Sequence, residues 1–324
     1  MKNLQPTSLL RHVTFRQLQI FAAAIRNGSF TKAADELFLA QPTISIQMKK
    51  LGEVVGLPLF EQIGRNIRPT DVGQDLFVAC QELFRTFENL DTQIADRKGL
   101  RRGKLRLGVV TTAKYIAPEI LAAFGERYPG LQFAMKVSNR DEIITRIQNN
   151  EDDLYIMGQV PDDEVDVEAI PFAHNPITVM AHRAHPLTLE PTPLPLAAIA
   201  EVPFLAREPG SGTRHAYLRL FAEKGLKPDI VMELGSNEAI KHAVASGLGI
   251  SILSIHSLAL EGTSGPIQIL DVEGFPILRK WYLVYPSGKR LSLTAQKFLE
   301  FSTSQGDFIT RRLVDLWPDL SRYL

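Results

Sequence analysis

The chain has 324 residues, 45% of them hydrophobic and 22% charged, which is ordinary for a globular protein and predicts two or three domains. Cys80 is the only cysteine, which excludes an intramolecular disulfide and redox sensing by two cysteines of one chain. The sequence holds no apolar run of the roughly 18 residues that a membrane span needs, and its first residues lack the apolar core of a signal peptide. We therefore expect a cytoplasmic protein.

Charge is unevenly distributed along the chain, although Lys and Arg balance Asp and Glu overall. Residues 1–70 hold nine basic and four acidic side chains, a net charge of 9 − 4 = +5. Residues 71–98 hold three and six, a net charge of −3, and the remaining 24 basic and 26 acidic side chains give −2. This distribution is typical of a DNA-binding head on a near-neutral body.

Three helices are expected first. An amphipathic helix from Thr14 to Ile25 precedes a second helix, for which Thr31 is the expected N-cap because its side-chain oxygen satisfies an unpaired amide. A turn over residues 38–40 leads to the third helix, whose first turn holds Pro42, where a missing N–H costs nothing. Two short helices joined by a tight turn are the geometry that places side chains in a DNA major groove.

The third helix has an apolar and a polar face. Its apolar residues recur at spacings of four, three and four, and we expect this seam to be buried: Ile44, Met48, Leu51 and Val55. On the opposite face, hydroxyl and amide groups near the helix start suit base edges, and the lysines further along suit phosphates. The alternative for this pattern is a plain helical domain with a solvated basic face.

A hairpin is expected after the third helix, with Arg65 near its tip and Arg68 just beyond, as a wing along the DNA backbone. Together with the helices it forms the predicted winged helix-turn-helix head, residues 1–70. The DNA-binding residues predicted in this head are Thr31, Gln41, Pro42, Thr43, Ser45, Gln47, Lys49, Lys50, Arg65 and Arg68.

One long helix is predicted over residues 70–96, because this stretch has no proline and its only glycine falls in the first turn. An apolar seam repeats along it at spacings of three and four, as in a coiled coil: Val72, Leu76, Ala79, Leu83, Phe87, Leu90 and Ile94. We expect residues 71–98 to pair two copies of the chain, since two heads on a palindromic site gain specificity. The alternative is that the seam packs on the protein's own body. A hinge is expected at residues 99–103, which are rich in glycine and arginine.

From residue 104 the pattern alternates between strands and helices, which predicts parallel sheets with helices on their faces. The elements expected in a first lobe are strands 104–110, 131–137 and 154–157 and helices 116–124 and 140–148. A second run of the same kind has strands 177–182, 203–205, 230–234 and 250–253 and helices 213–225 and 237–246. A strand at 280–285 and a helix from Thr294 are expected to return to the first lobe.

The predicted fold class is therefore α+β and multidomain. It combines a winged helix-turn-helix, a long linker helix and a two-lobed α/β effector domain, residues 104–324, like a periplasmic binding protein. We expect one lobe to span about 104–175 and 280–324 and the other about 176–279, with a cleft between them.

Four polar segments stand where expected strands end and helices begin, which is where such folds bind ligands: residues 111–114, 138–140, 207–214 and 235–238. Helix N-termini favour anions, and basic side chains accompany them here. We expect a small carboxylate or phosphate in the cleft, bound by Thr111, Thr112, Lys114, Ser138, Asn139, Arg140, Arg207, Ser211, Thr213, Arg214, Ser236 and Asn237. The alternative for each segment alone is ordinary helix capping.

The motifs of an enzyme are incomplete. Residues 286–290 lack the first glycine and the final hydroxyl residue of a phosphate loop, and residues 247–249 lack the third glycine of a dinucleotide fingerprint. His182 and His185 have metal-ligand spacing without an accompanying Cys or carboxylate cluster, so neither a metal nor another cofactor is expected. An enzyme, a transport-like binding protein and a ligand-insensitive DNA-binding protein remain the alternatives to a ligand-responsive regulator.

The head resembles the winged helix-turn-helix of LysR-type transcriptional regulators. The signature is carried by residues 28–30, 33–34, 37, 41–43, 45, 47 and 57–60. Gly52 stands where this family usually has glutamate, and we expect it to loosen the third helix by up to about 1 kcal/mol. Gln62 stands where arginine is common, which removes one phosphate contact.

The body resembles the CbbR-type subgroup of this family, which controls Calvin-cycle carbon-fixation operons. The resemblance is carried by residues 138–142, 157–158, 207–214, 236–238, 247–250 and 270–274. It implies an activator of carbon-fixation genes that binds promoter DNA as a homodimer or homotetramer, with RNA polymerase as a further partner. It also implies a phosphorylated or carboxylated effector such as ribulose bisphosphate, phosphoglycolate or phosphoenolpyruvate.

In LysR-type proteins the effector site is built from the places that Thr111, Thr112, Ser138 and residues 236–237 occupy here. The role of Arg140, Arg207 and Arg214 is inferred from their charge alone. A LysR-type regulator of another metabolic operon, with a different carboxylate effector, is the alternative within the family.

Overall fold

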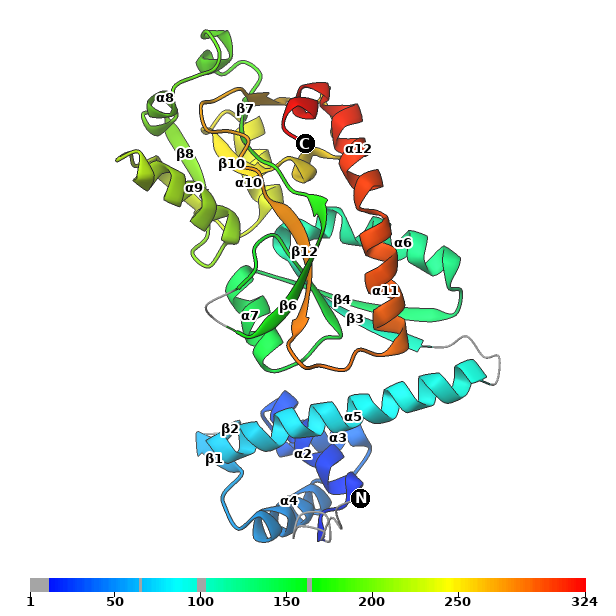
Figure 1. Ribbon diagram of the computed structural model, residues 1–324. Coiled ribbons are helices and arrows are strands. Elements are labelled where there is room, and N and C mark those ends of the chain that lie inside the picture. Colours follow the sequence, from blue (N-terminus) through cyan, green and yellow to red (C-terminus); the bar gives the residue numbers. More distant parts are fainter. Residues whose placement is uncertain (1–11, 64–65, 98–102, 162–164) are drawn as a thin grey trace. The chain divides into compact units, whose positions relative to one another are not determined.

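The computed structural model describes residues 12–63, 66–97, 103–161 and 165–324 (Figure 1). The chain divides into two compact units, an N-terminal unit of residues 1–91 and a C-terminal unit of residues 92–324. The expected wing-tip residue Arg65 lies outside the described residues, as does the expected hinge up to residue 102. Among the residues described, no helix is both long and apolar enough to cross a membrane.

The N-terminal unit consists of three helices, a hairpin and most of a long helix. In chain order its elements are α2 (Phe15–Asn27), α3 (Phe30–Leu37), α4 (Gln41–Val55), β1 (Phe60–Ile63), β2 (Asn66–Pro69) and α5 (Asp71–Arg97). β1 and β2 pair antiparallel, so the expected hairpin is present. Gly73 lies where a side chain would meet the carbonyl of Leu59, which lets the start of α5 pack closely against the hairpin.

The N-cap of α3 is Ser29 and not Thr31, which corrects the sequence-based expectation. Ser29 has extended backbone, and its Oγ accepts a hydrogen bond from the backbone N–H of Lys32 at 3.4 Å. Thr31 lies one residue inside the helix and is exposed. Both hydroxyl residues suit a cap, and the sequence pattern alone did not separate positions two residues apart.

The core of the N-terminal unit joins α2, α4 and α5. Its buried residues include Ile20, Phe21, Ile44, Met48, Leu51, Leu59, Phe77 and Cys80. Ala79 of the predicted seam is exposed in the single chain, while Phe77 and Cys80 face the core. The first half of the helix therefore packs on its own unit, whereas Phe87 and Leu90 further along are 53% and 49% exposed.

In the C-terminal unit, lobe I is built on a five-stranded sheet of order β4-β3-β5-β12-β6. Its strands are β3 (Gly103–Val110), β4 (Leu131–Ser138), β5 (Leu154–Met157), β6 (Val167–His174) and β12 (Lys280–Pro286). β3 pairs parallel with β4 and β5, as expected, but β12 runs antiparallel to β5 and β6. The parallel arrangement predicted for strands 104–110, 131–137 and 154–157 is therefore confirmed, and the sheet is mixed because β12, the strand by which the chain returns to lobe I, runs opposite to the other four.

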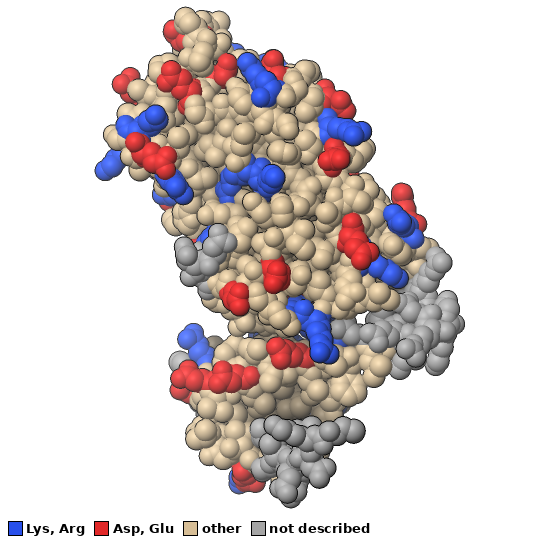
Figure 2. All heavy atoms as spheres, viewed as in Figure 1, with Lys and Arg blue, Asp and Glu red and all other residues tan. Residues whose placement is uncertain are grey.

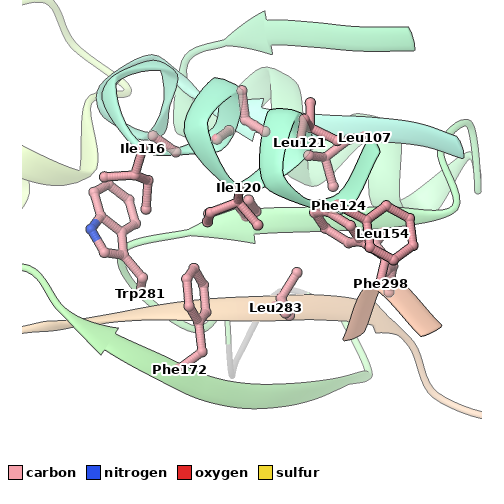
Figure 3. Close-up of a cluster of buried hydrophobic side chains, with 14 of the residues drawn as sticks. Leu107, Ile116, Ile120, Leu121, Phe124, Leu154, Phe172, Trp281, Leu283 and Phe298 are labelled. Atoms are coloured by element: carbon pink, nitrogen blue, oxygen red, sulfur yellow. The ribbon is translucent and has the colours of Figure 1, made fainter. Parts of the chain in front are cut away.

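Helices cover the sheet of lobe I and fill its core (Figure 3). They are η1 (Thr111–Tyr115), α6 (Ala117–Arg127), α7 (Arg140–Gln148), α11 (Leu293–Ser304) and α12 (Gly306–Leu316). Ile120 and Phe124 of α6 pack with Leu283 and Trp281 of β12 and Phe172 of β6. The expected helix 116–124 corresponds to α6, which begins one residue later and extends past Gly125 to Arg127, and the 3₁₀ turn η1 precedes it.

Lobe II has two sheets. The first has the antiparallel order β10-β7-β11, and the second pairs β8 and β9 in parallel. Its elements are β7 (Ile177–His182), η2 (Pro186–Leu189), α8 (Leu196–Ala200), β8 (Pro203–Arg207), α9 (Gly212–Glu223), β9 (Asp229–Leu234), α10 (Asn237–Ala245), β10 (Ser251–Ser254), η3 (Ile255–Leu258) and β11 (Ile267–Leu270). The expectation of a second parallel sheet therefore applies to β8 and β9 alone.

The end of the chain connects the lobes, and its assignment to lobe I needs correction. α12 packs on β6 through Ile309, and the chain then continues to η4 (Pro318–Arg322) beside lobe II (Figure 1). Leu313 and Leu320 are buried there against Ile255 of lobe II. The last dozen residues therefore belong to the packing of both lobes.

Candidate functional site

The recognition surface expected in the N-terminal unit lies on α4. Ile44, Met48 and Leu51 are buried, which leaves the other face of this helix accessible. Gln41, Pro42, Thr43, Lys49 and Lys50 are exposed, and Ser45 and Gln47 are partly exposed. The side-chain amide of Gln41 donates a hydrogen bond to Ser45 Oγ at 3.0 Å.

Two further exposed side chains of the N-terminal unit are placed where they could contact DNA. Arg68 of β2 is exposed, as a phosphate contact requires. Ile46, which the sequence analysis passed over, is 55% exposed on α4 between residues expected to read DNA. An apolar side chain at such a position suits the methyl group of thymine. The sequence feature that marks Ile46 is its position outside the apolar seam of this helix.

Three of the four polar segments of the C-terminal unit, 111–114, 138–140 and 207–214, meet at the boundary of the lobes, around a cavity that we call the inter-lobe cavity. It is lined by Val110, Thr111, Thr112, Asn139, Arg140, Met157, Gly158, Gln159, Asn175, Arg207, Ser211, Gly212, Thr213, Arg279 and Trp281. Its volume is about 30 Å³, enough for a water molecule or two. A ligand of several heavy atoms therefore requires that its walls move apart.

Three arginines give the inter-lobe cavity its charge: Arg140, Arg207 and Arg279. The lining residues include no Asp or Glu. Arg140 and Arg207 are 8% and 2% exposed, and burial together with the charge of Arg140 lowers the pKa of Arg279 to about 10. Arg279 is therefore still cationic at neutral pH. Glu208 pairs with Arg207, so the excess positive charge that favours an anion comes from Arg140 and Arg279. On the face seen in Figure 2, by contrast, Lys and Arg are interspersed with Asp and Glu.

Protein contacts hold two of these guanidinium groups in place. Arg207 donates two hydrogen bonds to the carboxylate of Glu208, at 2.7 and 2.8 Å, and a third to Asn237 Oδ1. Arg279 donates to the backbone oxygen of Gly212 at 3.0 Å and to Gln159 Oε1 at 3.1 Å. The charges are thus positioned before any ligand arrives, which lowers the entropy cost of binding.

Two helices begin at the inter-lobe cavity. Asn139 caps α7 by accepting a hydrogen bond from the backbone N–H of Glu142 at 2.9 Å, and Ser211 caps α9 in the same way from Arg214 at 3.4 Å. The first residues of both helices, including Arg140 and Thr213, line the cavity. The partial positive charge of two helix N-termini adds to that of the arginines.

Of the twelve effector-binding residues predicted from sequence, seven line the inter-lobe cavity: Thr111, Thr112, Asn139, Arg140, Arg207, Ser211 and Thr213. The other five do not line it: Lys114, Ser138, Arg214, Ser236 and Asn237. Asn237 still acts on the cavity, because its side chain holds Arg207.

Two of the residues outside the lining carry charges that are engaged elsewhere. Lys114 Nζ lies 3.7 Å from Glu238, and Arg214 pairs with Glu233 at 2.7 Å while donating to the backbone oxygen of Arg207 at 2.6 Å. Arg214 thus supports the end of β8 and does not face the ligand position.

The sequence analysis missed four polar residues of the inter-lobe cavity: Gln159, Asn175, Arg279 and Trp281. They lie on or next to the strands that connect the lobes, where no helix N-terminus marks them. Trp281 is fully buried, and its indole N–H has no hydrogen-bond partner among the described residues. Gly158 permits this arrangement, since a side chain there would approach Asn175 Nδ2 to 2.8 Å.

A group of charged and phenolic residues, which we call the inter-lobe ion cluster, ties η1 of lobe I to α10 of lobe II and the turn that follows η3: Lys114, Tyr115, Glu238, Lys241 and Glu261. The hydroxyl of Tyr115 donates to Glu238 Oε1 at 2.6 Å, and Lys241 Nζ pairs with Glu238 at 3.0 Å and with Glu261. Burial and the hydrogen bond to Glu238 raise the pKa of Tyr115, so it stays protonated. Burial alone would raise the pKa of Glu238, but the contacts with Tyr115 and Lys241 outweigh burial and lower this pKa.

Within the part of the chain that the structure describes, no group of three His, Cys, Asp or Glu side chains is placed to hold a metal ion. Cys80 is buried in the N-terminal unit, and burial raises the pKa of its thiol to about 12. The thiol therefore stays protonated at neutral pH.

Family models match both units. Residues 15–74 match the bacterial regulatory helix-turn-helix protein of the lysR family, and residues 98–307 match the LysR substrate binding domain. The chain is 47% identical to the transcriptional activator CmpR of Synechocystis over 90% of this chain and 95% of that protein. It is 42% identical to the transcriptional regulator CbbR of Rhodospirillum rubrum over 90% of this chain and 97% of that protein.

Solved structures agree with these matches. The regulatory domain of CcmR from Synechocystis PCC6803, determined in complex with 2-PG, is 44% identical and aligns with a TM-score of 0.62 over 64% of this chain and all of that one. Full-length CbnR in complex with its target DNA is 21% identical, with a TM-score of 0.65 over 90% of this chain and 99% of that one. At that identity, the likeness to CbnR shows the fold alone.

Proposed function

We propose that this chain, which belongs to the LysR family of bacterial transcriptional regulators, activates carbon-fixation genes in response to a small phosphorylated carboxylate. The regulators named among its relatives support the choice of genes, since they include CmpR, CbbR and two RuBisCO operon regulators at 42–47% identity. The inter-lobe cavity supports the choice of effector. Three arginines with no lining carboxylate are the observation that carries it.

The effector class follows from the charges and donors of the inter-lobe cavity. Arginine guanidinium groups bind phosphate and carboxylate oxygens in pairs, and the helix N-termini at Asn139 and Ser211 add backbone N–H donors. A molecule with an anionic group at each end uses arginines from both lobes. 2-Phosphoglycolate has this form, and the complex of the CcmR regulatory domain with 2-PG makes it the first candidate.

Effector binding also changes the arrangement of the lobes. The cavity holds only about 30 Å³, so an anion of this size enters only when the lobes or the arginine side chains move apart. A ligand shifts the protein between arrangements to the extent that it binds one better than the other. The difference between the anion's affinities for the two arrangements therefore supplies the free energy that shifts the protein from one to the other.

DNA recognition is assigned to the exposed face of α4, with Thr43, Ser45 and Gln47 toward base edges and Lys49, Lys50 and Arg68 toward phosphates. Gln47→Ala should weaken specific binding more than non-specific binding. Arg68→Ala should weaken both equally and reduce the slope of log affinity against log salt by about 1. An unchanged salt slope in Arg68→Ala would contradict the assignment of the hairpin as a wing.

Self-association is assigned to α5. Phe87 and Leu90 are half exposed on a helix whose earlier apolar residues are buried, so a second copy of the chain is the occupant that we propose for this surface. The test is sedimentation of Leu90→Lys beside the unchanged protein. A loss of the dimer supports the assignment, and an unchanged oligomeric state contradicts it.

The decisive experiment measures binding to the DNA upstream of the protein's own gene by fluorescence anisotropy, with and without 2-phosphoglycolate, phosphoenolpyruvate and ribulose bisphosphate. We expect tight, salt-sensitive binding that one of these anions shifts. Arg219→Met, which removes an arginine that is 83% exposed, is the matched control for changes in the cavity arginines. Binding that no anion alters would leave a DNA-binding protein without the proposed effector site.

A further inference from the structure

A second cavity lies on lobe II, at the free edge of the sheet β10-β7-β11. It is lined by residues of β7, η3, β11 and the C-terminal segment 316–323, and we call it the tail cavity. Its volume is about 340 Å³, roughly ten times that of the inter-lobe cavity. The two cavities share no lining residue.

The walls of the tail cavity are largely apolar and aromatic. Leu258, Ile267, Leu270 and Phe275 are each less than 9% exposed, and Trp317 joins them from the C-terminal segment. A ligand that displaces water from this wall gains the free energy of removing apolar surface from water.

One polar side chain in the lining of the tail cavity has no hydrogen-bond partner among the described residues. Thr178 is 2% exposed on the central strand β7, and its Oγ1 makes no hydrogen bond with any described residue. A buried hydroxyl in this state carries an unfavourable desolvation cost, which a ligand with one hydrogen-bonding group removes. The unpartnered hydroxyl of Thr178 therefore indicates a ligand that carries one hydrogen-bonding group.

The charges at the rim are balanced. The lining includes two arginines, Arg183 and Arg322, and two aspartates, Asp271 and Asp319, and both arginines are already engaged. Arg183 donates to the backbone oxygens of Thr263 and Gly265, and Arg322 donates to the backbone oxygen of Asp319 at 3.1 Å. The tail cavity therefore offers no excess charge to an anion, unlike the inter-lobe cavity.

From these observations we propose that the tail cavity is a binding site for a neutral, mainly apolar ring compound that carries one hydrogen-bonding group. The ring system packs against Leu258, Phe275 and Trp317, and its polar group meets Thr178 Oγ1. Because the wall formed by residues 316–323 also connects the lobes, occupancy stabilises the packing of this segment on lobe II. The site goes beyond the proposed function, since it takes a different class of ligand at a different place.

The test uses 5-fluoroindole as the probe, a neutral bicyclic ring with one N–H donor, titrated into the full-length protein and followed by fluorine NMR. We expect saturable binding that an excess of 2-phosphoglycolate does not displace. Thr178→Val should weaken it about threefold to tenfold, the value of one hydrogen bond. Leu258→Phe, which fills the cavity, should abolish it. Thr303→Val, an exposed threonine of α11, should leave it unchanged.

Three results would overturn the proposal. The first is the absence of saturable binding up to millimolar probe. The second is binding that Leu258→Phe leaves intact while thermal unfolding shows that this variant is folded. The third is displacement of the probe by 2-phosphoglycolate, which would place the probe in the inter-lobe cavity. The first two results do not bear on the anion site, whose readout is DNA binding.

Discussion

The two cavities of the C-terminal unit differ in charge and in volume. The inter-lobe cavity has three arginines, no lining carboxylate and about 30 Å³ of space, whereas the tail cavity has two arginines, two aspartates and about 340 Å³. We therefore expect the first to bind an anion only by moving its walls, and the second to accept a neutral ligand as it stands. The smaller cavity is therefore the one suited to signalling, because an anion can bind there only if the lobes or the arginine side chains move.

The element that separates the two cavities is η3. His256 of this turn lies with its ring centroid 5.9 Å from that of Trp281, which lines the inter-lobe cavity, while Leu258 lines the tail cavity. His256 Nε2 donates to the backbone oxygen of His174 at 2.9 Å. Burial lowers the pKa of His256 to about 4, so the imidazole is neutral at pH 7.

The largest effect that we expect comes from protonating His256. Its folded pKa lies below the usual value of 6.5, so its contribution to stability is complete above pH 6.5 and is lost as pH falls towards 4. The full loss is about 3 kcal/mol. Urea unfolding between pH 7 and 4.5 should show a smaller decline for His256→Gln than for the unchanged protein. Parallel declines in the two proteins would show that His256 does not contribute.

Arg140→Met tests the charge of the inter-lobe cavity. Replacing a buried guanidinium that faces the anion removes a charge-assisted interaction of about 1.5–3 kcal/mol, so affinity for 2-phosphoglycolate should fall tenfold to about a hundredfold. Titration calorimetry measures it, with Arg219→Met as the exposed control. Binding of 5-fluoroindole should not change. A parallel loss of both ligands would mean that the two cavities are not independent.

Sequence reasoning found those parts of the inter-lobe cavity that local chemistry marks. Asn139 and Arg140 stand at a helix start, where capping and charge are readable from neighbouring residues. Arg279 and Gln159, in contrast, are 120 residues apart and meet because β12 returns beside β5. A single sequence carries no record of that pairing, so four of the eleven polar residues in the cavity wall could not be predicted.

The errors have the same origin. Arg214 is basic and close in sequence to Arg207, yet the turn of α9 directs it to Glu233. The mixed sheet of lobe I also depends on which strands return from lobe II, and strand periodicity does not specify direction. Local signals thus predicted element types well, while strand order and the partners of charged side chains required the tertiary structure.

Tyr115→Phe should have a smaller effect, of opposite sign to that of Arg140→Met. The hydroxyl of Tyr115 in lobe I donates to Glu238 in lobe II, and this bond stabilises the narrow arrangement of the inter-lobe cavity by about 1 kcal/mol. Its removal lowers the cost of separating the walls, so anion affinity should rise by up to about fivefold. Calorimetry with Tyr128→Phe as control measures this. A fall in affinity would show that the inter-lobe ion cluster holds the binding-competent arrangement instead.

Thr178→Val has the smallest expected effect and examines the tail cavity without any ligand. Valine has the shape of threonine but no hydroxyl, so the change removes a buried polar atom that lacks a partner among the described residues. The free energy of unfolding should rise by up to about 1 kcal/mol. Urea unfolding measures it, with Thr303→Val as the exposed control. A loss of stability would mean that ordered water satisfies Thr178 in solution, and a ligand would then have to replace that water to bind.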